Sequence, residues 1–110
     1  MPDFLGEFEH LVLLAVARLG DDGYGMTIRR EIESRTGRSV SIGAVYTTLD
    51  RLEQKGLVAS RVGEPTPERG GRARRHFALL APGARALHDS RRILAAMWKD
   101  VSLDPTPRKT

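Results

Sequence analysis

SIGAVYTTLDRLEQKGLV, residues 41–58, is the stretch that decides the fold. Its apolar residues recur at spacings of three and four, which at about 100° per residue places them in one stripe. The stripe consists of Ile42, Val45, Leu49 and Leu52. Ser41 can cap the first turn, and Gly56 tolerates the left-handed conformation that ends many helices. The stretch therefore predicts one amphipathic helix that packs on a core through this stripe.

The opposite face of this predicted helix is small, hydroxylated and basic. It carries Gly43, Thr47, Asp50, Arg51 and Gln54, with Tyr46 and Thr48 on its flanks. Small residues let a helix backbone approach a DNA groove, hydroxyl groups can bind phosphates, and arginine can bind guanine O6 and N7. We expect Thr47 and Arg51 to read bases and Tyr46 and Thr48 to hold phosphates. The residues of this helix predicted to bind DNA are Ser41, Gly43, Ala44, Tyr46, Thr47, Thr48 and Arg51. For the helix taken alone, a merely solvated face is the competing interpretation.

Two further helices are predicted before this stretch. The first, within residues 4–19, has one apolar side with Phe8, Leu11, Val12, Ala15 and Leu19 and a second with Leu14 and Val16. The DDG sequence at residues 21–23 is typical of a turn and is expected to end this first helix. Residues 25–36 predict a helix that buries Ile28 and Ile32 and closes at Gly37. Together with the helix that begins after Ser41, this arrangement is a helix-turn-helix.

A hairpin is predicted after Gly56, where the apolar period changes to two. The two alternating runs are Val58, Ser60, Val62 and Arg75, Phe77, Leu79. The connection EPTPERGGRAR, residues 64–74, is rich in proline and glycine, and the basic residues crowd at its end: Arg69, Arg72, Arg74 and Arg75. A hairpin with a basic tip directly after a helix-turn-helix predicts a DNA-binding wing. A disordered polar loop that its arginines keep soluble is the alternative.

The last predicted helix begins at Pro82 and runs to about Val101, before the polar tail DPTPRKT. Its apolar seam has a period of seven, a helix-pairing signal, and contains Leu87, Ser90, Leu94, Met97 and Val101, with Ile93 and Trp98 alongside. We therefore expect a dimer interface here, although the helix could instead pack only on its own domain. The predicted organisation is a DNA-binding domain at residues 1–80, a dimerisation helix at 81–101 and a disordered tail at 102–110.

Composition limits the classes of function. The 110 residues suit one domain, and without cysteine neither a disulfide nor a thiolate site can form. The three histidines have no ligand spacing, so we expect no metal and no cofactor. No signal sequence or membrane span is apparent, and a cytoplasmic protein is expected. The net charge is +4, but residues 1–40 carry five Lys/Arg against seven Asp/Glu, and residues 41–110 carry thirteen against seven. An anionic partner is therefore expected to bind from the predicted third helix onward.

Four segments resemble the PadR-like winged-helix transcriptional regulators. They are HLVLLAVARLG (10–20), DDGYGMTIRREIE (21–33), SIGAVYTTLDRLEQKGLV (41–58) and GRARRHFALLAPGARAL (71–87), which occur in the family's order and at its separations. The resemblance implies a homodimer that binds operator DNA, usually as a repressor, with the third helix in the major groove and the wing on the backbone or minor groove. It also implies that the last helix pairs with the partner's N-terminal helix, which adds Phe8 and Leu11 to the interface.

The resemblance also assigns individual residues. Tyr46 corresponds to the family's motif tyrosine, Arg51 to its basic position before the second leucine, and Arg72, Arg74 and Arg75 to its basic wing. Two positions depart from the pattern. Thr47 stands where many members have proline, and Leu80 stands where a threonine commonly caps the last helix. Members differ in what they sense, so the resemblance does not assign an effector.

These observations together predict a mainly α winged helix-turn-helix (α-α-α-β-β-α) that acts as a dimeric DNA-binding repressor. A small flat apolar effector could stack at the dimer interface near Trp98. The main alternative is a protein-docking module, because winged helices also serve that purpose. An enzyme is the second alternative, and the chain lacks a cysteine nucleophile, convergent carboxylates and a phosphate loop for that role.

Overall fold

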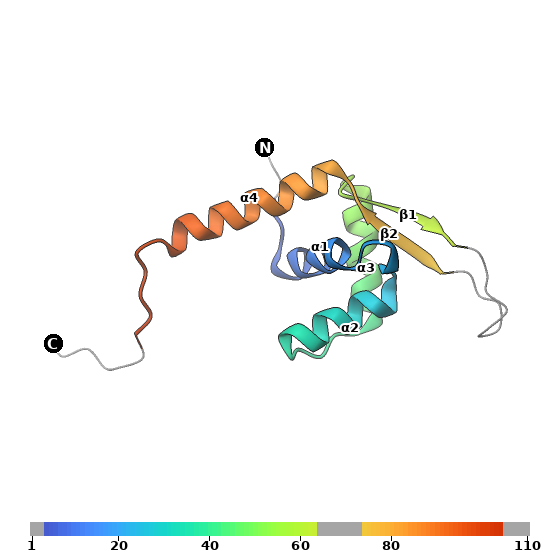
Figure 1. The fold of residues 1–110 in the computed structure, drawn as a ribbon, viewed down its shortest axis with the longest axis horizontal. Coiled ribbons are helices and arrows are strands. Elements are labelled where there is room, and N and C mark those ends of the chain that lie inside the picture. The colour runs from blue at the N-terminus through green and yellow to red at the C-terminus, as the bar shows by residue number, and fades with distance from the viewer. Residues whose placement is uncertain (1–3, 64–73, 105–110) are drawn as a thin grey trace.

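The computed structural model describes residues 4–63 and 74–104. The elements in chain order are α1 (Glu7–Leu19), the short 3-10 helix η1 (Gly20–Asp22), α2 (Gly25–Thr36), α3 (Ile42–Gln54), β1 (Val58–Val62), β2 (Arg75–Leu79) and α4 (Ala81–Trp98). Helices α1, α2 and α3 form one body, the hairpin projects from it on one side, and α4 extends away on the other (Figure 1). This order is the predicted one, and the winged helix-turn-helix fold is confirmed.

The core lies where α1, α2 and α3 meet the first half of the hairpin. Its fully buried side chains are Val12, Leu13, Val16, Ile28, Val45, Leu49, Leu52, Val58 and Phe77. The predicted stripe of α3 and the predicted inner side of α2 are therefore confirmed. On α1 the prediction was partly wrong, because Leu13 is buried whereas Leu14 is 40% exposed. Apolar residues surround this helix on several sides, so its rotation depends on packing rather than on its own pattern.

Both ends of α3 are capped as predicted. The Ala44 amide donates to the Ser41 hydroxyl oxygen at 3.1 Å, which satisfies one free amide of the first turn. At the other end Gly56 has φ +75°, and the Leu57 amide donates to the Leu52 carbonyl at 3.0 Å. This is the Schellman arrangement, which turns the chain directly from α3 into β1.

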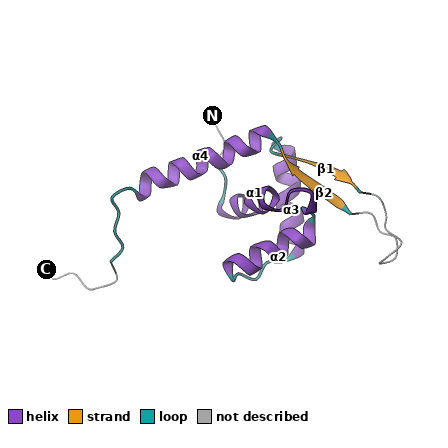
Figure 2. Ribbon diagram, viewed as in Figure 1, coloured by secondary structure: helices purple, strands orange, loops and turns teal. Residues whose placement is uncertain are grey.

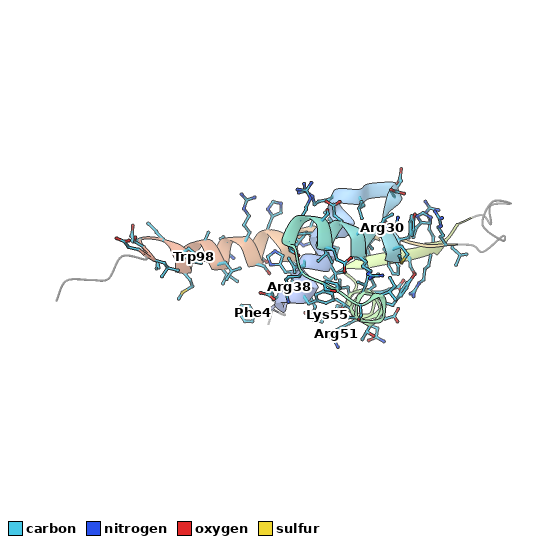
Figure 3. All side chains as sticks on the ribbon, turned by 90° about the horizontal axis from the view of Figure 1, so that it is seen from below. Phe4, Arg30, Arg38, Arg51, Lys55 and Trp98 are labelled. Carbon is cyan, nitrogen blue, oxygen red and sulfur yellow. The ribbon has the colours of Figure 1, made fainter. Side chains whose placement is uncertain are left out.

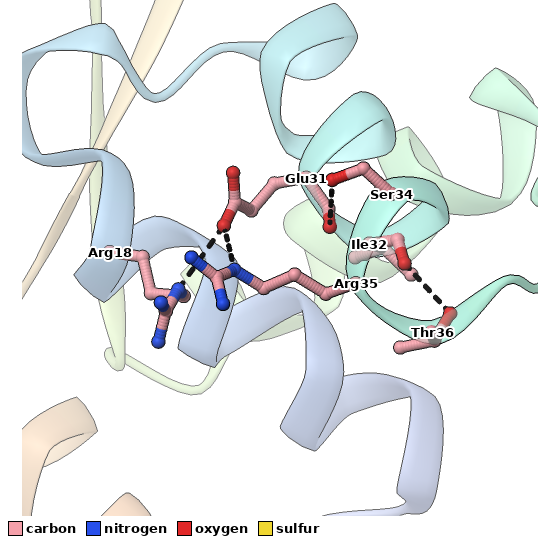
Figure 4. A network of polar contacts seen from close by, with 6 residues as sticks. All are labelled: Arg18, Glu31, Ile32, Ser34, Arg35 and Thr36. Carbon is pink, nitrogen blue, oxygen red and sulfur yellow. Dashed lines mark hydrogen bonds and ion pairs between the residues drawn. The ribbon is translucent and has the colours of Figure 1, made fainter.

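Helix α2 is joined to α1 through a small polar network around Glu31 (Figure 4). Glu31 accepts from Arg18 of α1 at 3.1 Å and also pairs with Arg35, one turn further along α2. The Arg35 guanidinium is the main cause of the lowered pKa of Glu31. Gly37, with φ +73°, ends the helix and leads to α3.

The hairpin is antiparallel, with Val58 opposite Leu79 and Val62 opposite Arg75. It is tied to the three-helix body because the Phe77 amide donates to the Gly23 carbonyl at 2.8 Å. The hairpin leads directly into α4, as the secondary-structure view shows (Figure 2).

The first turn of α4 packs closely on the start of β1. A Cβ added at Gly83 would lie 2.3 Å from the carbonyl oxygen of Leu57, so the two backbones approach each other more closely than a side chain allows. The helix ends at Trp98, three residues before its predicted end, and Asp100 follows with φ +62°. None of the helices in the described ranges is long and apolar enough to cross a membrane. Residues 105–110 of the predicted tail lie outside the described residues.

Candidate nucleic-acid interface

The outer face of α3 is open, as the sequence predicted. Five residues expected to meet DNA are exposed on it or at its start: Ser41, Gly43, Ala44, Thr47 and Arg51. Apart from its neighbours in α3 itself, no atom of the described residues lies within 4 Å of a Cβ built at Gly43, so the backbone is accessible at this position. A groove-binding helix needs such a face, because its backbone and short side chains must come close to base edges.

Thr48 is a correction to the predicted interface. It is only 6% exposed, whereas a phosphate contact needs an accessible hydroxyl group. The residue follows Val45 by three positions, so it lies on the side of α3 that packs on the core. The predicted phosphate contact by Thr48 is therefore wrong.

Tyr46 is 39% exposed, and its ring leans toward the start of α2. A Cβ added at Gly25 would lie 2.4 Å from both the Cζ atom and the hydroxyl oxygen of Tyr46. The glycine therefore makes room for the ring, and the ring contributes to the spacing between α2 and α3. The exposed part of Tyr46 remains on the flank that the sequence predicted.

Arg51 and Lys55 lie next to each other at the edge of the molecule formed by α3, and Trp98 lies far from them along α4 (Figure 3). Within the described residues Arg51 forms no hydrogen bond or ion pair, so its guanidinium is available to a ligand. Lys55 was not predicted as a site residue, although its position four residues after Arg51 places it on the same helix face.

Lys55 has an intramolecular partner, the buried carboxylate of Glu9. The ammonium lies 2.9 Å from Oε2 of Glu9, and the Gly6 amide donates to the other oxygen, Oε1, at 3.0 Å. Burial would raise the pKa of Glu9, but these two hydrogen bonds, with the nearby charges of Lys55 and Arg51, outweigh it and lower the pKa. The pair joins α1 to the end of α3.

The two predicted wing arginines that lie within the described residues, Arg74 and Arg75, both interact with the protein itself. Arg74 lies over the ring of Tyr24, 4.5 Å from its centroid, and donates to the Tyr24 hydroxyl at 3.1 Å. Arg75 pairs with Asp50 at 2.9 Å and with Glu53 at 2.5 Å, both on α3. Arg69 and Arg72, the other predicted wing residues, lie outside the described residues. Arg61 of β1, which was not predicted, is exposed and without an ion pair inside the described ranges.

The residues predicted for the dimer interface divide into two groups. Phe8, Leu11 and Leu87 are half-buried and pack against the chain's own core, and Ser90 is half-buried. By contrast, Leu94, Met97, Trp98 and Val101 are all at least half exposed, with Met97 at 73% and Trp98 at 57%. With Leu103 these four line an apolar hollow of about 190 Å³.

A larger apolar groove of about 610 Å³ lies between α1 and α4. The residues of α1 that line it are His10, Leu14 and Ala17, and those of α4 include Leu87 and Leu94. Neither Phe8 nor Leu11, which the family resemblance suggested, lines the groove.

The geometry defines a winged helix-turn-helix, a class of protein in which many members present the third helix to DNA. Comparison with known proteins makes this more specific. Residues 13–89 match the model of the Transcriptional regulator PadR-like family. Transcriptional regulator Rv3488 of Mycobacterium tuberculosis is 39% identical over 80 residues, which cover 71% of this chain and 68% of that protein. The chain belongs to the PadR-like family of transcriptional regulators.

Solved structures agree with the fold. RosR of H. salinarum is 28% identical, with a TM-score of 0.67 over 89% of this chain and 81% of that one. A PadR family transcription regulator from Clostridium difficile R20291 has a TM-score of 0.71, and the match covers 86% of this chain and 93% of that one. At 22% identity the second similarity concerns the fold alone.

Proposed function

We propose that this protein is a dimeric repressor that binds a pseudo-palindromic operator. The observation that carries the proposal is the open face of α3, on which Arg51 has no hydrogen bond or ion pair within the described residues, whereas Lys55 and Arg75 beside it are both paired with carboxylates. In this arrangement α3 enters the major groove and the hairpin follows the adjacent backbone. No catalytic activity is part of this role, and we expect the protein to act in the cytoplasm, where its DNA lies.

The exposed residues expected to meet DNA have separate roles in the proposed complex. Thr47 and Arg51 read base edges, and Tyr46 holds a phosphate from the flank. Ser41, Gly43 and Ala44 allow the first turn of α3 to approach the DNA backbone, where free helix amides favour phosphate. The wing contributes mainly nonspecific affinity through its basic residues, with residues 1–80 forming the DNA-binding unit.

The dimer is proposed to form through α4, which acts as the dimerisation helix. Leu94, Met97 and Trp98 lose water only against a second chain, and the groove between α1 and α4 offers an apolar surface for the partner's helix. Burying a large apolar side chain contributes roughly 1.5–3 kcal/mol, so these residues can supply much of the association free energy. A two-fold dimer requires half-sites about one helical turn apart, or a multiple of it.

Selection of bound sequences from random duplexes by the full-length protein tests operator binding. We expect an enriched pseudo-palindrome whose half-sites are spaced by whole helical turns. Enrichment of no sequence, with affinity that depends on salt alone, would contradict the proposal and favour a docking module.

Sedimentation tests the dimer. The double variant Leu94→Lys with Met97→Lys changes two exposed residues and should shift the protein to monomer and weaken operator binding. Arg92→Ala, on the same exposed stretch of α4 but lining neither the groove nor the hollow beside Trp98, is the matched control and should remain dimeric. A lysine double variant that stays dimeric would show that α4 is not the interface.

An effector could bind in the same region. The hollow formed by Leu94, Met97, Trp98, Val101 and Leu103 is apolar and lies on the surface that the dimer would share. A flat apolar molecule stacked on Trp98 would change the distance between the two recognition helices. Quenching of the Trp98 fluorescence by such a molecule, together with a loss of operator affinity, is the expected result.

A further inference from the structure

Arg75 is held between two carboxylates of the helix proposed to read DNA. It is the first residue of β2, and its guanidinium donates to Oδ1 of Asp50 at 2.9 Å and to Oε1 of Glu53 at 2.5 Å. The same group lies over the Phe77 ring, 4.9 Å from its centroid. Asp50 and Glu53 are three residues apart on α3, so one guanidinium fork can bind both.

Glu53 joins the same cluster to the other strand. Its second oxygen, Oε2, accepts from the Ser60 amide at 3.0 Å and from the Ser60 hydroxyl at 2.6 Å. The Ser60 hydroxyl is the main cause of the lowered pKa of Glu53, and Arg75 lowers it further, so Glu53 is charged at neutral pH. One side chain of α3 therefore contacts β1 directly and β2 through Arg75.

The electrostatics argue against a direct contact of Arg75 with DNA. If Arg75 turned to a DNA phosphate, the carboxylates of Asp50 and Glu53 would be left without a cation. They would then lie unpaired next to the negatively charged DNA and repel it. While Arg75 stays in place it offsets one of these two negative charges. The surroundings of Arg75 thus differ from those of Arg51, which forms no hydrogen bond or ion pair within the described part of the chain.

We propose that Arg75 is a positioning residue that locks the hairpin onto α3 and does not itself contact DNA. This inference rests on the proposed function and assigns to Arg75 a role other than the phosphate contact expected from the sequence. The lock sets the direction in which the wing leaves α3. Loss of these ion pairs should therefore weaken specific binding to the operator more than nonspecific binding to DNA.

The first experiment needs no DNA. In the full-length protein, a guanidinium held by two carboxylates rotates slowly about its Cζ–N bonds, and side-chain NMR of arginine detects this. We expect slow rotation for Arg75, faster rotation after Glu53→Gln, and no change at Arg75 after Arg61→Met, the matched control on β1. Free rotation of the Arg75 guanidinium in the unaltered protein would refute the proposal that Arg75 holds the hairpin on α3, whether or not the chain binds DNA.

The second experiment measures the ratio of operator affinity to random-DNA affinity, because a change of overall charge affects both alike. Arg75→Met and Glu53→Gln should each lower this ratio by roughly three- to tenfold, and the double variant should be no worse than either single variant, since coupled partners are not additive. Arg75→Lys should behave like Arg75→Met, because one ammonium cannot replace the fork. Thermal unfolding of each variant confirms that it remains folded.

A direct contact of Arg75 gives a different pattern. If Arg75 bound a phosphate, Arg75→Met would weaken binding to operator and random DNA equally. It would also reduce the slope of log affinity against log salt by about one unit, and Arg75→Lys would restore binding. If Arg75 read a base, Arg75→Met would lower the ratio but Glu53→Gln, which leaves the arginine in place, would not. Either pattern would overturn the positioning role. Failure of the unaltered protein to bind any operator would instead count against the proposed function. The NMR result would still show whether Arg75 holds the hairpin on α3.

Discussion

Gly83 and Gly43 form a matched pair that tests how α4 is seated. Both are glycines in the first turn of a helix, where alanine has the better helix propensity by up to about 1 kcal/mol. A Cβ at Gly43 meets nothing within 4 Å, whereas at Gly83 it would lie 2.3 Å from the Leu57 carbonyl oxygen and 2.7 Å from Cδ1 of Leu79. The Leu79 side chain can rotate away, but the Leu57 backbone cannot.

We therefore expect opposite effects on stability. Gly43→Ala should raise the free energy of unfolding by about 0.5–1 kcal/mol, because it removes backbone freedom from the unfolded chain without strain. Gly83→Ala should lower it by about 1–3 kcal/mol, the usual cost of forcing extra volume into a packed contact. For a chain of this size each kcal/mol corresponds to about 4–8 °C in melting temperature.

Urea and thermal unfolding of the two full-length variants provide the measurement. Both should be run at several protein concentrations, because association also stabilises the folded chain. Equal stability of Gly83→Ala and Gly43→Ala would refute the close seating of α4 on β1. A Gly83→Ala variant that is destabilised only at high concentration would place the effect in the dimer rather than in this contact.

Three further results are expected. Arg51→Ala should reduce discrimination between operator and random DNA by about 1–3 kcal/mol, and equal weakening of both in a titration would show that Arg51 reads no base. Replacing Arg69, Arg72 and Arg74 by alanine should reduce the slope of log affinity against log salt by up to about three units, and an unchanged slope would return these residues to a solubility role. Glu9→Gln should be less stable than the unaltered protein at pH 7. Because folding lowers the pKa of Glu9 below its ordinary value of 4.5, the stabilisation is present above that value and is lost as the pH falls through the folded pKa, so the two unfolding curves should converge in acid.

The sequence predicted the features whose causes are local. The caps of α3 and its apolar stripe are encoded by residues close together in the sequence. The caps were confirmed at Ser41 and Gly56, and the stripe was confirmed by the burial of Val45, Leu49 and Leu52. The rotation of α1 was harder to predict because Leu13 and Leu14 are the same residue type, and only contact with the other helices buries one and exposes the other. Thr48 was misplaced for a related reason. The core surrounds more of α3 than its four apolar residues indicate, so a residue expected on the flank is buried.

The wing arginines show why charge along the sequence was not enough to define the interface. Residues 41–110 carry a large excess of Lys/Arg, yet several of these cations bind groups of the protein itself. Arg75 pairs with Asp50, which is 25 residues away in sequence, and Arg74 with Tyr24, which is 50 residues away. Such partners have no local signature, so only the fold reveals them.

An engaged cation still affects DNA binding, but by a different route. It cancels carboxylates that would repel phosphates, and it holds the element that carries it. A cation such as Arg51, which has no hydrogen bond or ion pair among the described residues, instead gains its full hydrogen bonding from the ligand. The affinity of this chain for DNA should therefore follow the number of free cations on the α3 side more closely than the total charge. Substitutions that remove Glu9, and so release Lys55, would then increase affinity for all DNA sequences alike.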